Sequence, residues 1–325
     1  TNNPSKPRKC CTGLSLQQIF YGAPGTGKSC GIKRVLAGNN IPNENIFRTT
    51  FHPDSDYSTF VGAYKPTMEV VPHYESSTGA PIEEKRITYN FIPQAFLNAY
   101  VRAYQTDENV YLLDRGDDGK SDYSIKADTD IRTYLEEVLG DDNEGIKGGN
   151  LCLPANLYIL ATMNTSDQSL FPIDSAFKRR WEWEYVPIRN EEKGWVIAAD
   201  GKEWVWWEFL NAVNEKIGSI TDSEDKKLGY FFVKPADGHT ITAKTFVGKV
   251  LFYLWNDVFK DYGFSDDEFQ TEDGKEMKYS MFYETEGGKD VNERLIARFL
   301  SNLKLKTVDA ADVTAEEITA EEDEA

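Results

Sequence analysis

The sequence has few of the residues from which metal sites and disulfide scaffolds are built. Its 325 residues include four cysteines and three histidines. The cysteines have neither the spacing of a zinc site nor the density of a disulfide framework, and they stand at Cys10, Cys11, Cys30 and Cys152. We therefore expect reduced thiols, and we expect any metal ion to arrive together with a ligand.

Long apolar runs and an excess of positive charge are also absent. No run approaches the roughly twenty apolar residues of a membrane-spanning helix, and the polar start, residues 1–9, lacks the apolar core of a signal peptide. These features predict a cytoplasmic protein with no membrane partner. The formal net charge of -18 argues against nonspecific nucleic-acid binding over the whole surface, because phosphodiesters attract Lys and Arg.

Composition and periodicity divide the chain into four segments. Residues 1–15 show no period and are expected to be a lead-in or a linker remnant, and residues 16–187 are expected to form an α/β core. Residues 188–306 are rich in Trp and Phe at helical spacing, which predicts a smaller, mainly helical lid domain. Residues 307–325 are expected to be a disordered acidic tail, since the last seventeen residues contain eight acids and no basic residue.

In the core segment, expected strands alternate with expected helices, which predicts a parallel sheet. Strands are expected at 16–21, 46–51, 109–113 and 156–163, and helices at 30–36, 91–104 and 131–139. Further helices are expected at 204–217, 246–262 and 291–303. The aromatic cluster of the first of these could stack on bases, but packing in the core explains it better; its members are Trp204, Trp206, Trp207 and Phe209.

A phosphate-binding loop follows the first expected strand directly. Its eight residues match the pattern G-x-x-x-x-G-K-[ST] and lie between a strand and a helix; they are Gly22, Ala23, Pro24, Gly25, Thr26, Gly27, Lys28 and Ser29. The glycines let backbone N–H groups turn toward phosphate oxygens at a helix N-terminus. We expect Lys28 to reach the β- and γ-phosphates and the Ser29 hydroxyl to ligate Mg²⁺.

Downstream motifs resemble a known family. Residues 157–187, LYILATMNTSDQSLFPIDSAFKRRWEWEYVP, resemble the AAA+ domain of the McrB family, the NTPase subunits of McrBC-type modification-dependent restriction systems. The sequence MNTSD at 163–167 is close to the family's MNT[AS]D signature, and residues 51–61 and 228–233 are also similar to family segments. The resemblance covers about residues 16–303. It implies an AAA+ core, ATP or GTP as substrate with Mg²⁺, a ring of identical subunits, most simply a hexamer, a McrC-like nuclease partner, and DNA.

The resemblance also implies roles for single residues. Asn164, at the tip of a buried strand, would be the polar sensor that orients the attacking water, and a strand-end cap is the alternative. Arg179 and Arg180 follow a short expected helix, where an AAA+ arginine finger would act on a neighbouring subunit's γ-phosphate. Which of the two is the finger stays open, and a surface basic run is the alternative.

One expected element departs from the family. An AAA+ site needs a strand that ends in two acids, one for Mg²⁺ and one to polarise water. Here Asp114 ends the run 110–114, but Arg115 stands where the catalytic Glu is expected. Asp114 is therefore a candidate Mg²⁺ ligand. The alternative, which we favour, is that about twenty residues of the family pattern are absent between 112 and 113, which would remove part of a central strand.

Three functions remain in competition. The first is an oligomeric NTPase that couples hydrolysis to DNA translocation and activates a nuclease. The second is a nucleotide-locked assembly scaffold without turnover, because no intact acid pair is visible. The third, a small-molecule kinase with the same loop, leaves Asn164 and the paired arginines without a purpose.

Overall fold

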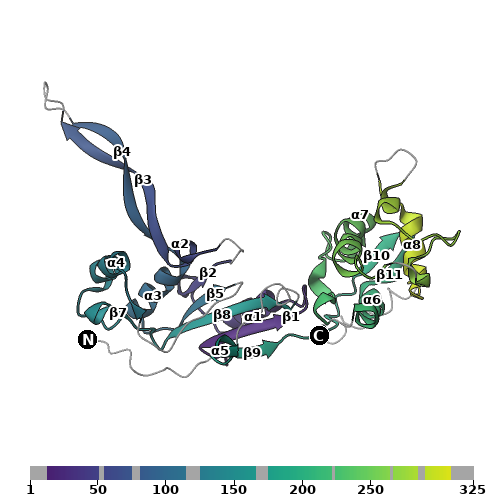
Figure 1. The fold of residues 1–325 in the computed structure, drawn as a ribbon, viewed down its shortest axis with the longest axis horizontal. Coiled ribbons are helices and arrows are strands. Elements are labelled where there is room, and N and C mark those ends of the chain that lie inside the picture. The colour runs from purple at the N-terminus through teal and green to yellow at the C-terminus, as the bar shows by residue number, and fades with distance from the viewer. Residues whose placement is uncertain are drawn as a thin grey trace, which may run out of the picture. The chain divides into compact units, whose positions relative to one another are not determined.

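The computed structural model describes residues 13–50, 55–74, 81–114, 125–165, 175–221, 224–263, 266–284 and 290–308 (Figure 1). Its contacts divide the chain into two compact units. The sheet unit comprises residues 1–20, 29–163 and 172–184, and the C-terminal unit comprises residues 21–28, 164–171 and 185–325. Among the helices of the described residues, none combines the length and apolar character that crossing a bilayer requires.

A five-stranded parallel sheet, flanked by helices, forms the centre of the α/β fold, as the sequence predicted. The strand order is β2-β5-β8-β1-β9. The bounds are Gln17–Gly22 for β1, Ile46–Arg48 for β2, Val110–Asp114 for β5, Leu157–Asn164 for β8 and Glu182–Tyr185 for β9. The runs of apolar residues in β5 and β8 suit this arrangement, because strands of a parallel sheet are covered on both faces.

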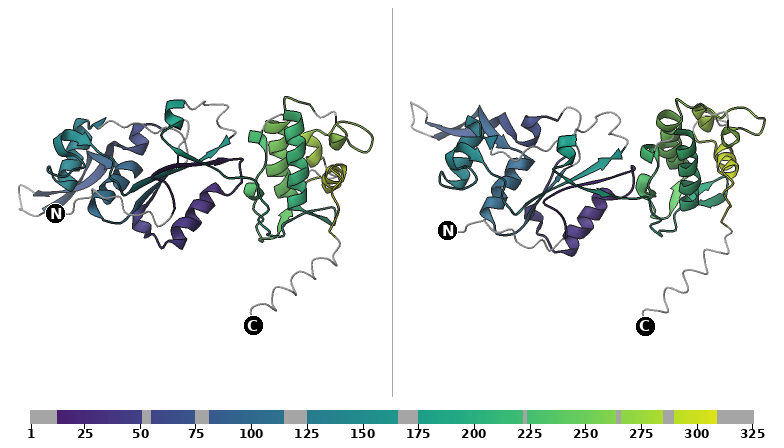
Figure 2. Two further views of the ribbon diagram at one scale, coloured as in Figure 1. Left: turned by 90° about the horizontal axis from the view of Figure 1, so that it is seen from below. Right: turned by 60° about the horizontal axis from the view of Figure 1, so that its bottom comes forward.

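Three helices lie in the crossovers that connect β1, β2, β5 and β8. They are α1 (Lys28–Gly38), α3 (Ala95–Gln105) and α4 (Thr129–Leu139), and Figure 2 shows α1 lying along the sheet. The crossover from β1 to β2 and that from β2 to β5 run in opposite directions across the sheet, so right-handed connections place α1 and α3 on opposite faces. Helix α4 begins at Asp128, whose carboxylate accepts the Ile131 N–H at 2.8 Å.

A long antiparallel ribbon, formed by β3 (Gly62–Tyr74) and β4 (Pro81–Pro93), extends from the sheet unit (Figure 1). The sequence analysis did not predict it. The helix expected at 91–104 begins only at Ala95, because Phe91 pairs with Tyr64 in the ribbon. Side chains alternate between its faces, and the register places Met68 beside Ile87 on a largely apolar, solvent-exposed face. The short elements α2 (Tyr57–Phe60), β6 (Ile125–Lys126), β7 (Asn150–Leu151) and α5 (Ser175–Lys178) complete this unit.

The C-terminal unit combines a small sheet with helices. Strands β10 (Val196–Ala199), β11 (Lys202–Val205) and β12 (Thr240–Thr242) pair in the order β11-β10-β12. The helices are α6 (Trp206–Thr221), α7 (Ala243–Thr245), which continues through π-type turns at Phe246–Leu251 and Leu254–Val258, and α8 (Glu293–Asn302). The aromatic cluster is confirmed as core, since Trp204, Trp206 and Phe209 are buried and Trp207 packs against them.

The acidic tail was expected to begin at residue 307, but the first two residues of that segment are ordered. Thr307 forms an antiparallel bridge with Trp204, and the Val308 N–H donates to the Glu203 carbonyl at 2.9 Å. They extend the edge of β11 because that edge offers unpaired backbone groups. Residues 309–325 lie outside the described residues.

Candidate functional site

The phosphate loop joins the end of β1 to the start of α1. Gly25 and Gly27 both have left-handed backbone angles, with φ of 82° and 81°, and Thr26 lies between them. Alternation of this kind turns successive backbone N–H groups to one side of the chain and makes a concave site for anions. The Thr26 hydroxyl donates to the Ala23 carbonyl at 3.1 Å, which closes the loop on itself. A loop of this shape can accommodate an anion.

Lys28 is buried although it carries a charge. Its ammonium donates to the carbonyl oxygens of Gly22 at 2.9 Å and Ala23 at 2.8 Å. A buried ammonium needs such partners, because burial without them would cost several kcal/mol. The one cation of the loop is therefore held against the loop backbone, within reach of whatever the loop binds.

A distant segment, residues 228–232, contacts the same loop within the C-terminal unit. The Gly229 N–H donates to the Pro24 carbonyl at 2.8 Å, and the Phe231 N–H donates to the Gly25 carbonyl at 2.7 Å. No role was predicted for this segment from the sequence. The available signal was the family similarity of residues 228–233, which marked the segment without showing where it packs.

In the sheet unit, Ser29 lies beside strand β8. Its hydroxyl is 3.4 Å from the Thr162 hydroxyl, and either group can be the donor. Asn164 is the last residue of β8, two residues after Thr162; it belongs to the C-terminal unit and is half-buried. Because side chains alternate along a strand, Thr162 and Asn164 lie on the same face of β8. Thr162 is a second site candidate that the sequence analysis did not identify.

Strand β5 pairs on both of its sides over the residues present, and the expected absence of about twenty residues between 112 and 113 stays a prediction. The strand pairs with β2 on one side and with β8 on the other, with Asp114 in register with Ala161. The run 110–114 alone is long enough to pair with both neighbours, and helix α4 supplies the crossover to β8. The backbone of Asp114 is therefore one register position from Thr162.

Arg179 and Arg180 follow α5 directly and are exposed. The Arg179 N–H donates to the Ser175 carbonyl at 3.3 Å, and the Trp183 indole N–H donates to the Lys178 carbonyl at 2.9 Å. These bonds fix the end of the short helix and leave both guanidinium groups at the surface.

The chain is similar to known components of restriction systems. No protein-family model matches the chain. Over 289 aligned residues it is 33% identical to the Type II restriction enzyme BsuMI component YdiS of Bacillus subtilis (strain 168), with 76% of this chain and 80% of the relative covered. The chain belongs to the family of McrB-like restriction-system proteins.

A second, more distant member of the McrB-like family matches over a shorter stretch. It is the Type IV methyl-directed restriction enzyme EcoKMcrB subunit of Escherichia coli (strain K12), 25% identical over 176 residues, which are 51% of this chain and 34% of the relative. The chain thus spans about a third of that protein. The Bacillus alignment has 289 positions, which is more than the number of residues in 76% of this 325-residue chain. Some aligned positions therefore hold residues of the relative that have no counterpart here.

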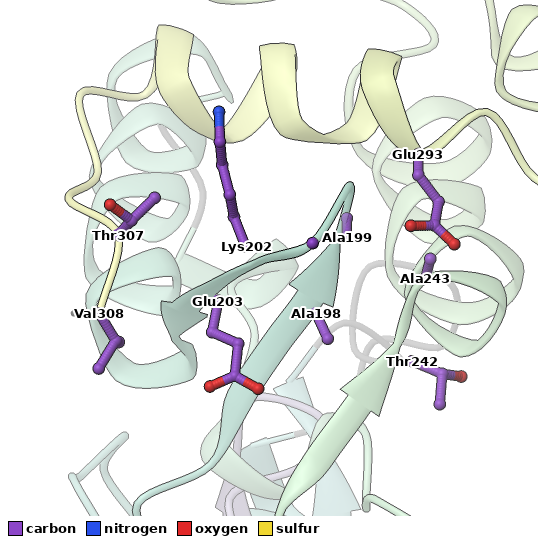
Figure 3. Close-up of a pocket in the computed structure, with 10 residues that line it drawn as sticks. Ala198, Ala199, Lys202, Glu203, Thr242, Ala243, Glu293, Thr307 and Val308 are labelled. Atoms are coloured by element: carbon purple, nitrogen blue, oxygen red, sulfur yellow. The ribbon is translucent and has the colours of Figure 1, made fainter. Parts of the chain in front are cut away.

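A cavity of about 750 Å³ lies elsewhere, beside the small sheet of the C-terminal unit (Figure 3). Lys202 reaches toward α8, and Glu293 lies at the start of that helix, where its carboxylate accepts the Asp200 N–H at 2.7 Å. The lining includes two acids, Glu203 and Glu293, against one lysine. This charge balance disfavours a triphosphate, so in this McrB-like chain the phosphate loop is the better candidate site.

Proposed function

We propose that the chain binds a Mg²⁺–nucleoside triphosphate through residues 22–29 and hydrolyses it as the AAA+ motor of a restriction system. The observation that carries the proposal is the loop itself. Two left-handed glycines on either side of Thr26 form an anion-binding concavity, and Lys28 is buried against it. A buried lysine at such a loop suits a ligand with several negative charges, because its ammonium can exchange neutral carbonyl partners for phosphate oxygens.

The chemistry can be divided among the residues near the carboxyl ends of the strands. Ser29 would ligate Mg²⁺, and Asp114 would bind the ion directly or through water, since hard cations prefer oxygen ligands. Asn164 would orient the attacking water. Negative charge that develops on the γ-phosphate would be stabilised by Lys28, by Mg²⁺ and by an arginine from a neighbouring subunit.

The arginine role requires assembly. Arg179 and Arg180 are exposed in the single chain, as a finger that acts on a neighbour would be. We propose a ring of identical chains in the cytoplasm, a hexamer by family resemblance, with residues 16–187 as the motor core and residues 188–306 as its lid. In such a ring each nucleotide contacts two subunits, so its binding favours assembly.

The restriction-system relatives suggest further partners. The Bacillus protein is called a component and the Escherichia coli protein a subunit, which supports an assembly of different chains. We propose a McrC-like nuclease subunit as the partner, with DNA as the substrate of the whole complex. The net charge of -18 places DNA contact on a restricted surface or on the partner.

A nucleotide-locked scaffold without turnover is the second candidate function. Arg115 follows Asp114 where a catalytic acid is expected, and a guanidinium cannot act as a base at neutral pH. The additional residues of the Bacillus relative are a reason to look for a second acid in a longer native chain. On this alternative, nucleotide binds and promotes assembly, but no phosphate is released.

The deciding experiment compares ATP and GTP in two assays on the full native chain. Calorimetry measures binding with and without Mg²⁺, and phosphate release measures turnover. We expect Lys28→Ala to abolish detectable binding, while Lys147→Ala, which removes an exposed lysine that pairs with Glu144, leaves it unchanged. Unaltered affinity in Lys28→Ala would refute the site. Binding without phosphate release would leave the scaffold function.

A further inference from the structure

We infer that residues 228–232, the brace segment, hold the phosphate loop in its anion-binding shape and thereby set its affinity for phosphate. The inference rests on the proposed function of residues 22–29 and adds positioning residues to that site. It depends on three features of the C-terminal unit. These are the direction of two backbone hydrogen bonds, the close approach of the Gly229 backbone to the loop backbone, and the attachment of the brace segment to helix α6.

The two hydrogen bonds fix the orientation of two peptide planes. The carbonyls of Pro24 and Gly25 both accept N–H groups of the brace segment, from Gly229 and Phe231. In a trans peptide the carbonyl and the following N–H point in opposite directions. The N–H groups of Gly25 and Thr26 must therefore point away from the brace segment. This orientation leaves them available to phosphate oxygens.

The contact between the brace segment and the loop has no room for a side chain. A Cβ atom on Gly229 would lie 2.4 Å from both the Gly25 carbonyl carbon and the Thr26 nitrogen. These are backbone atoms, which cannot turn aside as a side chain could. The ring of Phe231 covers Gly27, with ring atoms 3.1 and 3.2 Å from the position of a Cβ there. Glycine at 229 is thus required for the two backbones to approach.

Helix α6 also holds the brace segment. The buried Asn214 side chain donates to the Leu228 carbonyl at 2.8 Å and accepts the Leu228 N–H at 2.7 Å. The buried Trp206 indole N–H donates to the Tyr230 carbonyl at 2.8 Å. Buried polar groups that are fully paired in this way specify one conformation. The loop is therefore braced by a segment that is itself fixed to the helical core.

The test is Gly229→Ala in the full chain, with Gly248→Ala as the matched control. Gly248 lies in the helical turn Phe246–Leu251, and a Cβ there meets no atom within 4 Å. Calorimetry with Mg²⁺ would use the triphosphate that the parental chain binds and inorganic tripolyphosphate, which has no base or sugar. We expect at least a tenfold loss of affinity for both ligands in Gly229→Ala and parental affinity in Gly248→Ala.

A purely structural role of Gly229 would lower stability without changing the affinity of the folded protein, so urea unfolding is measured alongside. Parental affinity in a folded Gly229→Ala variant would overturn the inference. If that variant fails to fold, Asn214→Leu provides the second test, because it removes the side-chain hydrogen bonds to Leu228 and leaves the loop residues unchanged. Unchanged phosphate affinity in Asn214→Leu would also overturn the inference. If the parental chain binds no triphosphate, the proposed function fails first, and the inference fails with it.

Discussion

Replacing Thr162 with valine should weaken the magnesium-dependent part of nucleotide binding. The substitution keeps the shape of the side chain and removes only the hydroxyl that lies 3.4 Å from the Ser29 hydroxyl. If Ser29 donates its proton to Thr162, its lone pairs are directed toward the metal ion. Valine removes that acceptor, so Ser29 must find another orientation before it can ligate Mg²⁺.

The expected magnitude follows from the geometry of this contact. A hydrogen bond between neutral groups contributes about 0.5–1.5 kcal/mol net, and the 3.4 Å between these two hydroxyls is longer than an ordinary O–H···O hydrogen bond. We therefore take the lower half, about 0.5–1 kcal/mol, which corresponds to a loss of affinity of about two- to fivefold. Valine suits a strand, so the free energy of unfolding should change little.

The assay is calorimetric titration of nucleotide at several Mg²⁺ concentrations. Thr133→Val serves as the control, since the Thr133 hydroxyl donates to the Thr129 carbonyl on the exposed side of α4. A double-mutant cycle with Ser29→Ala tests the route of the effect. If Thr162 acts through Ser29, its replacement has no further effect once Ser29 is alanine. An equal loss of affinity with and without Mg²⁺ would refute the reasoning, as would full additivity in the cycle.

Three further predictions follow from the same residues and their surroundings. Replacing both Arg179 and Arg180 with Ala should leave binding nearly intact and lower phosphate release by at least about a hundredfold, because a finger acts on charge in the transition state; parental turnover would exclude the finger. Asp114→Asn should raise the Mg²⁺ concentration needed for half-maximal turnover, and Asp141→Asn, at an exposed position, is the control. An unchanged Mg²⁺ requirement would favour the alternative that another acidic residue ligates the ion. Trp206→Phe should lower the free energy of unfolding by about 2–4 kcal/mol in urea denaturation, because it leaves the Tyr230 carbonyl without its indole donor and removes buried volume; a loss below about 1 kcal/mol would show that the indole bond contributes little.

Much of the parallel sheet and the phosphate loop could be predicted because their signals are local. The phosphate loop needs a strand, a glycine turn and a helix within a few consecutive residues, and β5 and β8 are apolar runs bounded by polar residues. The ribbon of β3 and β4 was missed although its apolar residues alternate. Pro66 and Pro72 argue against a strand, but a two-stranded ribbon has free edges that tolerate proline.

The brace segment could not be derived from local sequence, because its effect depends on contacts between distant parts of the chain. Nothing near Gly229 indicates that its Cα lies against the backbone of Gly25 and Thr26. The same limit applies to Thr162, whose relevance depends on the neighbouring position of β1 and β8 in the sheet. Sequence patterns identify a site through residues that act locally, whereas the residues that position it are found only when the chain is folded.

This difference explains why the phosphate-loop motif is not sufficient for the site. Positive φ at Gly25 and Gly27 allows the loop to curve around an anion, but flexible glycines also allow other shapes. The carbonyl contacts of Pro24 and Gly25 select one of them, and an ordered site binds more tightly because less entropy is lost on binding. Affinity for the phosphate chain should therefore depend on how firmly Asn214 and Trp206 hold the brace segment, even though neither side chain belongs to the motif.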